Sequence, residues 1–259
     1  MEETIVINSE PKNQKHGVDN KDIEIEKLNS KLEELTAEMN QFSYIVSHDL
    51  QAPLRMITGF LELLEKKYGD KLDDSAMQYI GYAVKGAGKM KSLIFDLLEY
   101  SRLNAENLEK VDVDMNEVMQ EVKEKFATAI GEKNIKVNVG QLPVVMANKK
   151  QMSRLFEQLF DNAIKFRVDT ASEISIDAKN ENGFWNFCVK DNGMGIDPAF
   201  FEKIFIIFRR LNTDEVKYPG TGVGLTICKK IVELHNGTIW LESAVDNGSK
   251  FYFRLPASK

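Results

Sequence analysis

The sequence is poor in residues that mark several common classes of protein. Its 259 residues include two cysteines, Cys188 and Cys228, which form no CxxC pair. Each lies among apolar residues, which predicts two buried thiols in a reducing compartment. No run reaches the roughly 18 apolar residues that span a membrane, and the acidic N-terminus MEETIVINSE lacks a secretory signal. We therefore expect a cytoplasmic protein without a membrane span.

Basic residues are also fewer than acidic ones. The chain has 34 lysines and arginines against 40 aspartates and glutamates, which gives a formal net charge of −6. This balance does not favour a nucleic-acid partner. The length is sufficient for one large domain or two small ones.

Apolar residues recur at helical intervals over residues 25–46. From Ile25 to Val46 the spacings alternate between three and four, with Glu and Lys between them, which is the a/d repeat of a coiled coil. An amphipathic helix packed on its own domain is the alternative. The pattern continues to a charged turn near Gly69, and residues 77–101 resume it. Two such helices predict an antiparallel hairpin, and two hairpins from two chains would bury the apolar seam as a four-helix bundle.

The second half of the chain alternates between short β-rich runs and helical stretches. We expect strands at 135–139, 173–178, 184–190, 238–243 and 250–255. We expect helices near 115–130, 149–166, 198–208 and 223–235. Because several strands follow one another without crossover helices, the sheet should be mixed or antiparallel with helices on one face. The predicted fold class is therefore α+β.

Two glycine-rich stretches indicate a ligand site. DNGMGI at 191–196 follows an expected strand, and GTGVGL at 220–225 precedes an expected helix. The second is neither a GxxxxGK[ST] phosphate loop nor the dinucleotide fingerprint. Its glycines would let the backbone approach a ligand, and the helix that starts there would present its positive end to an anion. An ordinary turn is the alternative for each stretch alone.

The helix expected at 149–166 carries a polar side chain on its apolar face. A buried amide without a partner costs about 1–3 kcal/mol, so Asn162 should have one. A ligand or a metal ion is one candidate, and a backbone group is the other. Lys165 lies one turn from Asp161 and could reach a phosphate.

The stretch SYIVSHDLQAPLR at 43–55 holds one of only three histidines. With Val46 at the centre of the apolar stripe, His48 falls about 200° away and should be exposed. An ordinary surface histidine is the alternative from the helix alone. A neutral imidazole can attack a phosphorus atom through its free lone pair, while Asp49 holds the other ring N–H. Pro53 removes one helical N–H and should bend the helix just beyond the histidine.

Together these motifs resemble the sensor histidine kinases of two-component systems, and residues 200–243 are especially similar to the phytochrome-type members. The resemblance covers residues 42–255. It implies an α/β-sandwich ATP-binding domain of the type shared with gyrase, Hsp90 and MutL. It also implies ATP-dependent autophosphorylation of His48 in a homodimer, followed by transfer to an aspartate of a response regulator receiver domain. The alternatives are a superfamily ATPase without histidine phosphorylation, and a coiled-coil scaffold with a degenerate nucleotide site.

The resemblance also implies a role for each motif residue, with ATP and Mg²⁺ as cofactors. His48 would be phosphorylated, and Asp49 would orient or activate its imidazole. Asn162 would bind Mg²⁺ through its side-chain oxygen, Lys165 would contact phosphate, and Asp191 would accept the adenine amino group. Gly193 and Gly195 would let the adenine base lie against the backbone. The phosphate-facing loop would contain Gly220, Gly222 and Gly224.

Four segments follow from these assignments. They are a disordered tail at 1–22, a coiled-coil signalling helix at 23–41, a dimerisation and histidine phosphotransfer domain at 42–105, and an ATP-binding catalytic domain at 112–259. Within the last, 201–208 match the F box and 209–219 the ATP lid. The chain departs from the family pattern at two positions. Gln158 stands where the family often has Asn, which keeps an amide with a longer reach. Ala52 stands where it often has Thr or Asn, which puts phosphatase activity in doubt.

Overall fold

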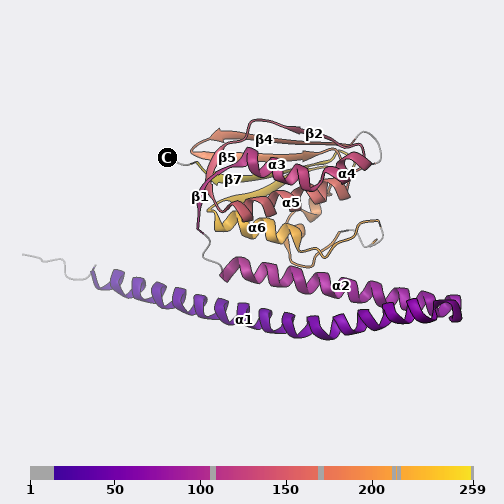
Figure 1. Cartoon of the computed structure of the whole chain (residues 1–259). Helices are drawn as coiled ribbons and strands as arrows, with labels where there is room; N and C mark the ends of the chain where they lie inside the picture. The colour runs from indigo at the N-terminus through magenta and orange to yellow at the C-terminus, as the bar shows by residue number, and fades with distance from the viewer. Residues whose placement is uncertain (1–14, 106–108, 169–171, 212–213, 215–216, 258–259) are drawn as a thin grey trace, which may run out of the picture.

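The computed structural model describes residues 15–105, 109–168, 172–211, 214 and 217–257, with the side chains of 15–22 and of several positions between 32 and 48 and at 104–105 left aside. A helical hairpin precedes an α+β domain (Figure 1). The α+β fold class predicted from the sequence is confirmed. Within the described part of the chain, no helix has the length and apolar character needed to cross a membrane.

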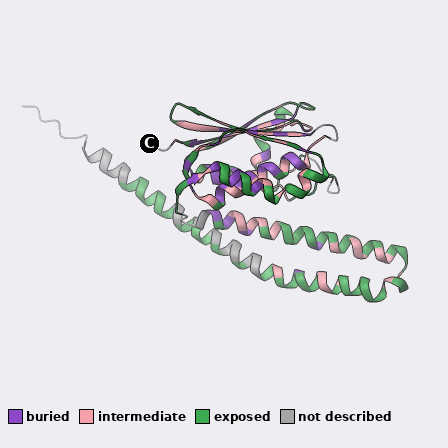
Figure 2. Cartoon of the chain, turned by 45° about the horizontal axis from the view of Figure 1, so that its top comes forward, coloured by how far each residue is buried: buried purple, intermediate pink, exposed green. Residues whose placement is uncertain are grey.

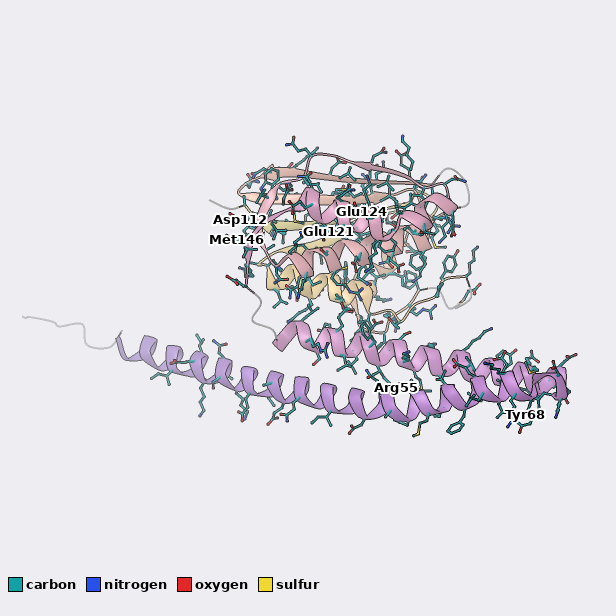
Figure 3. The ribbon with its side chains drawn as sticks, viewed as in Figure 1. Arg55, Tyr68, Asp112, Glu121, Glu124 and Met146 are labelled. Atoms are coloured by element: carbon teal, nitrogen blue, oxygen red, sulfur yellow. The ribbon has the colours of Figure 1, made fainter. Side chains whose placement is uncertain are left out.

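The hairpin consists of α1 (Lys15–Tyr68), a 3₁₀ turn (Gly69–Lys71) and α2 (Asp74–Ala105). The two helices run antiparallel, and Tyr68 marks the tip far from the α+β domain (Figure 3). Asp73 starts α2 by accepting a hydrogen bond from the backbone N–H of Ala76 at 2.7 Å.

Helix α1 begins earlier than the sequence predicted. Residues 15–22 are helical, in place of the disordered tail expected at 1–22. Extending an existing helix costs far less than starting one, so polar residues can join its end. Residues 1–14, the rest of that predicted tail, lie outside the described residues.

The hairpin buries few of its apolar side chains within one chain (Figure 2). Leu54, Ala87 and Leu98 are buried. Ile57 is 50% exposed and Phe60 is 68% exposed, although both are large and apolar. A single hairpin therefore leaves a long apolar surface open to water.

The α+β domain contains seven strands and four α-helices among the described residues. They are β1 (Val111–Asp114), α3 (Met115–Lys125), α4 (Ala127–Glu132), β2 (Lys136–Val139), β3 (Val144–Ala147), α5 (Lys149–Lys165), β4 (Glu173–Glu181), β5 (Phe184–Asp191), α6 (Gly224–Leu234), β6 (Thr238–Ser243) and β7 (Ser249–Pro256). The main sheet has the order β2-β4-β5-β7-β6. Only β2 and β4 pair in parallel within it, so the predicted mixed sheet is confirmed. Helices α3, α5 and α6 lie on one face of it, and the hairpin lies beyond them (Figure 1).

The core of the domain forms between α5 and the sheet. The ring of Phe156 meets those of Phe187 and Phe253 edge-on, with centroids 6.3 and 5.6 Å away. Phe187 and Phe253 stack on each other at 4.6 Å across the β5–β7 pair. Asn148 starts α5 by accepting a hydrogen bond from the N–H of Gln151. This packing fixes which face of α5 points away from the sheet.

Several elements differ from the sequence prediction. The helix expected at 198–208 is instead two 3₁₀ turns, Pro198–Phe200 and Lys203–Phe205. The backbone becomes extended at Ile206, and Phe208 takes a φ of 62°, so a helix cannot continue through them. The helix expected at 115–130 is divided into α3 and α4, and the small antiparallel pair of β1 and β3 was missed. Strands of four residues give only a short alternation, and the sequence analysis recognised β2 but not β1 or β3.

The two cysteines were both predicted to be buried. Cys228 is buried and Cys188 is half-buried, and neither forms a disulfide. Cys188 lies on the sheet face that α5 does not cover, where its cross-strand neighbour is Tyr252.

Neighbouring valines of β3 offer a matched test of this core. Val145 is fully buried, whereas Val144 is 51% exposed. Val145→Ala should lower the free energy of unfolding by about 2 kcal/mol, because it leaves a cavity. Val144→Ala should change it by less than about 0.5 kcal/mol. Urea unfolding followed by tryptophan fluorescence can compare them, and equal losses would contradict the assigned burial.

Candidate functional site

A pocket of about 330 Å³ lies between the C-terminal half of α5, the loop after β5, the segment before the second glycine stretch and the start of α6. This volume is typical of a small-molecule site. Seven of the eight residues predicted to bind nucleotide line it: Asn162, Lys165, Asp191, Gly195, Gly220, Gly222 and Gly224. Gly193 supports the pocket lining indirectly, since its N–H donates a hydrogen bond to Asp191 Oδ1 at 2.8 Å. The fold thus brings motifs far apart in the sequence to one cavity.

Asp191 is a half-buried carboxylate at the end of β5. Its Oδ1 accepts hydrogen bonds from the backbone N–H groups of Gly193 and Ser249, at 2.8 and 3.2 Å. Burial raises the pKa of Asp191, and these two bonds only partly oppose that rise. Because both bonds end on Oδ1, the second carboxylate oxygen is not used by them. A ligand with an N–H donor would fit this wall.

The pocket lining also includes a cation at the end of α5, Lys165. Burial lowers the pKa of Lys165, and the charge of Arg210 adds to this effect while Asp161 opposes it. The ammonium lies 4.6 Å from the ring centroid of Phe166. An anionic ligand would favour the charged form of this lysine.

Two residues of the segment predicted to be the lid close one side of the pocket. The ring of Tyr218 stacks on Phe166 with centroids 5.3 Å apart, and Arg210 Nη2 donates to the carbonyl oxygen of Tyr218 at 2.8 Å. The motif analysis predicted the segment 209–219 as a lid but singled out neither Tyr218 nor Arg210. The ring pair joins positions too distant for any local pattern to indicate it.

The second glycine loop leads directly into α6. Gly220 and Gly222 have φ values of 149° and 80°, and a Cβ at Gly222 would lie 2.8 Å from the carbonyl oxygen of Arg209. The N-cap of α6 is Val223, which has no polar side chain to cap the helix. Gly224 and Leu225 of its first turn line the pocket. This end of α6 is therefore suited to an anion.

Two amides of α5 differ in what they can offer a metal ion. Asn162 is half-buried in the pocket wall. When the oxygen of Gln158 faces Arg154, it accepts from Nη1 and Nη2 at 3.0 and 3.1 Å. That oxygen is then engaged, so Asn162 is the better candidate ligand. Across the residues that the structure describes, no group of three His, Cys, Asp or Glu side chains could hold a metal ion. Mg²⁺ at nucleotide sites usually takes one or two protein oxygens plus phosphate oxygens. The amide oxygen of Asn162 in the pocket lining fits this pattern.

The proposed phospho-acceptor lies apart from the pocket. His48 belongs to α1, and its side chain lies outside the described residues. Asp49 is exposed on the same helix. No residue of α1 appears among the described residues that line the pocket.

A second histidine, His235, has a structural role at the end of α6. Its Nδ1 donates to the carbonyl oxygen of Ile231 at 2.8 Å, and its Nε2 accepts from the N–H of Asn148 at 3.0 Å. Burial lowers its pKa. This histidine joins the end of α6 to the start of α5 as a neutral ring.

Comparison with known proteins places both parts of the chain. Residues 38–106 match the His Kinase A (phospho-acceptor) domain, and residues 147–259 match the histidine kinase-, DNA gyrase B- and HSP90-like ATPase family. The phytochrome-like protein Cph1 of Synechocystis sp. is 42% identical over 90% of this chain and 31% of its own length. The chain belongs to the sensor histidine kinases. It spans about a third of the length of such curated relatives.

Solved histidine kinase structures share this arrangement. Full-length ShkA in complex with AMPPNP aligns with a TM-score of 0.64 and 26% identity, over 85% of this chain and 46% of ShkA. ThkA in complex with the response regulator protein TrrA aligns with a TM-score of 0.58 and 26% identity, over 84% of this chain and 61% of that chain. The kinase core described above therefore combines a hairpin and an ATPase-type domain in the manner of its relatives.

Replacing Asp191 with asparagine should change nucleotide binding and the stability of the fold in opposite directions. Asp191→Asn should weaken nucleotide binding about tenfold to a hundredfold, because a charge-assisted hydrogen bond contributes roughly 1.5–3 kcal/mol. The raised pKa of Asp191 means that the native state binds more protons than the unfolded state above the ordinary value of 3.8. The contribution of Asp191 to wild-type stability should therefore fall as pH rises from about 4, and the asparagine variant should lack this contribution.

Calorimetric titration and urea unfolding at pH 5 and pH 7 measure the two effects. Asp177→Asn, on an exposed position of β4, is the matched control and should change neither. Unchanged nucleotide affinity in Asp191→Asn would remove this carboxylate from the binding site.

Proposed function

We propose that the chain is the core of a protein histidine kinase that uses ATP to phosphorylate His48. The observation that carries the proposal is the joint presence of the assembled pocket and the phospho-acceptor domain that contains this histidine. A ring nitrogen of His48 forms a bond to the γ-phosphorus while the bond to the bridging oxygen of ADP breaks. The phosphoryl group then passes to an aspartate of a response regulator, and the histidine is regenerated.

The residues of the pocket have complementary roles toward ATP in this proposal. Asp191 accepts the adenine amino group at the buried wall. Lys165 and the N-terminal end of α6 stabilise the phosphates at the other wall. Bound Mg²⁺, held through Asn162, would neutralise part of the phosphate charge. Tyr218 and Arg210 would exclude water from the pocket if the lid stays closed over the nucleotide.

The solved relatives support both the nucleotide and the partner. ShkA was solved in complex with AMPPNP, and ThkA in complex with a response regulator protein. These complexes are the basis for assigning ATP and a receiver domain to this chain. A cytoplasmic location remains a prediction.

Incubation with γ-labelled ATP and Mg²⁺ tests the phosphorylation of His48. The wild type should acquire label that is lost in acid and retained in alkali, as expected for phosphohistidine. His48→Ala should acquire none. Its nucleotide affinity should equal that of the wild type, because none of the residues assigned to nucleotide binding belongs to α1, and this equality is the control for folding. Label that persists in His48→Ala would contradict the assignment, and ATP hydrolysis without label would indicate a plain ATPase.

We also infer that the hairpin pairs with that of a second chain. Ile57 and Leu64, on the stripe predicted to face a partner, are 50% and 42% exposed in one chain. Other large side chains of the hairpin, including Phe60 and Phe95, are exposed as well. Each buried apolar side chain of this size contributes roughly 1.5–3 kcal/mol, so a four-helix bundle would gain substantial stability.

Sedimentation velocity at micromolar concentration should show a dimer. Ile57→Asp should shift the chain toward monomer, because a charge would have to be buried at the seam. Arg55→Asp, about half a turn away on the opposite face of α1, should leave the dimer intact. A folded monomer for the wild type would refute the bundle.

A further inference from the structure

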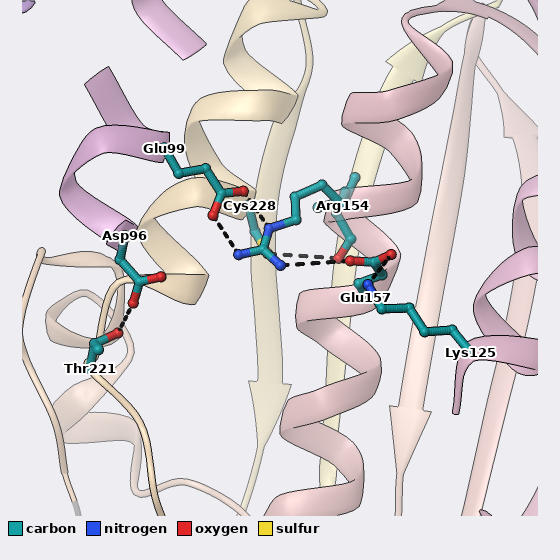
Figure 4. Close-up of polar contacts among 8 residues, drawn as sticks. Asp96, Glu99, Lys125, Arg154, Glu157, Thr221 and Cys228 are labelled. Carbon is teal, nitrogen blue, oxygen red and sulfur yellow. Dashed lines mark hydrogen bonds and ion pairs between the residues drawn. The ribbon is translucent and has the colours of Figure 1, made fainter. Parts of the chain in front are cut away.

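The last turns of α2 contact the α+β domain beside the nucleotide pocket. Leu103 is buried and belongs to the hydrophobic core of the domain, and Tyr100 packs against that core. Two carboxylates on the same stretch, Asp96 and Glu99, also reach the domain (Figure 4). The hairpin is therefore docked on the domain by an apolar contact with two acidic side chains next to it.

Glu99 binds an arginine of α5 through both carboxylate oxygens. Arg154 Nη2 donates to Glu99 Oε2 at 2.5 Å, and Arg154 Nε pairs with Oε1. The two side chains are 27% and 22% exposed, so solvent screens this pair only partly. Arg154 Nη1 also lies 3.6 Å from Glu157 on its own helix. Glu99 is therefore the acidic partner that ties the guanidinium of Arg154 to the hairpin, beside Glu157 of its own helix.

Arg154 transmits this contact to the pocket wall. Its guanidinium binds the amide oxygen of Gln158, one turn further along α5. The Gln158 amide is pressed against the start of α6, since a Cβ at Gly224 would lie within 2.1 Å of it. An unbroken series of contacts thus connects Glu99 of the hairpin to the first residue of the helix that faces the pocket.

Asp96 acts directly on the glycine loop. It accepts a hydrogen bond from the hydroxyl of Thr221, which lies between Gly220 and Gly222 and lines the pocket. This bond places a negative charge beside a loop and a helix end that are otherwise suited to phosphate. A nucleoside triphosphate is anionic, so a carboxylate beside this loop repels its phosphates.

We propose that Asp96 and Glu99 form a latch that fixes the loop 220–224 against α2 and opposes the binding of nucleotide phosphates. The proposal rests on the assignment of the pocket to ATP. Coupling between two binding events is reciprocal. Release of the latch tightens nucleotide binding, and a bound nucleotide weakens the docking of α2 by the same factor. The domain thereby becomes free to move relative to the hairpin when it is loaded with nucleotide.

Neutral variants of the latch test the first half of the coupling. Asp96→Asn and Glu99→Gln in the full chain should each bind AMPPNP roughly fivefold or more tightly than the wild type. Their affinity for adenosine, which lacks phosphates, should not change. Asp74→Asn removes the same charge from the exposed start of α2 and is the matched control. If Asp96 and Glu99 served only in folding, their variants would keep the wild-type ratio of AMPPNP affinity to adenosine affinity.

Hydrogen exchange of the unaltered chain tests the second half. Saturating AMPPNP should speed the exchange of backbone amides over residues 96–103, where α2 docks, and leave residues 77–90 unchanged. This measurement needs no substitution, so it stands even if a variant folds poorly.

The possible results separate the latch from the proposed function. If the wild type binds AMPPNP but both latch variants bind it no more tightly than Asp74→Asn does, the latch is wrong and the kinase assignment stands. Unchanged or slower exchange over 96–103 would also overturn the latch. If the wild type binds no nucleotide at all, both the kinase assignment and the latch fall.

Discussion

The packing of α5 against the sheet is the constraint on which the site depends. Its apolar residues fit between the sheet and the other helices, and Leu155, Phe156, Leu159 and Phe160 are essentially inaccessible to water. Burying this face fixes the rotation of the helix. Four polar residues then fall in a row at helical spacing: Arg154, Gln158, Asn162 and Lys165. One end of the row meets the hairpin, and the other end lines the pocket.

Magnitudes show which interaction sets this arrangement. A buried phenylalanine contributes about 1.5–3 kcal/mol, and this face carries two of them, Phe156 and Phe160. A partly exposed ion pair such as Arg154–Glu99 contributes about 1 kcal/mol or less. The core therefore decides where the polar row points, and the ion pair only adjusts the docking of α2. Such a contact is weak enough to be broken by a ligand without disturbing the fold.

Much of the fold could be predicted because it follows periodicity. The 3–4 spacing indicated the hairpin and α5, and short β-rich runs indicated the strands of the main sheet. Failures occurred where tertiary contacts override local preference. Residues 198–208 are apolar enough for a helix, yet the extended backbone at Ile206 and the left-handed Phe208 interrupt it. The contact between Asp96 and Thr221 joins residues 125 positions apart, and no local pattern could have indicated it.

The pocket could be predicted as a set of motifs, but its electrostatics required the fold. Asp191 and Lys165 come from β5 and α5, and each is displaced from its ordinary pKa by burial, upward for the acid and downward for the base. Both shifts mean that burial disfavours the charged form of each group, which costs the domain stability. A ligand with N–H donors at one end and phosphates at the other would satisfy both groups together. The packing of the core around Phe156 offsets this cost. The domain can therefore keep two poorly solvated charged groups available to a ligand with N–H donors at one end and phosphates at the other.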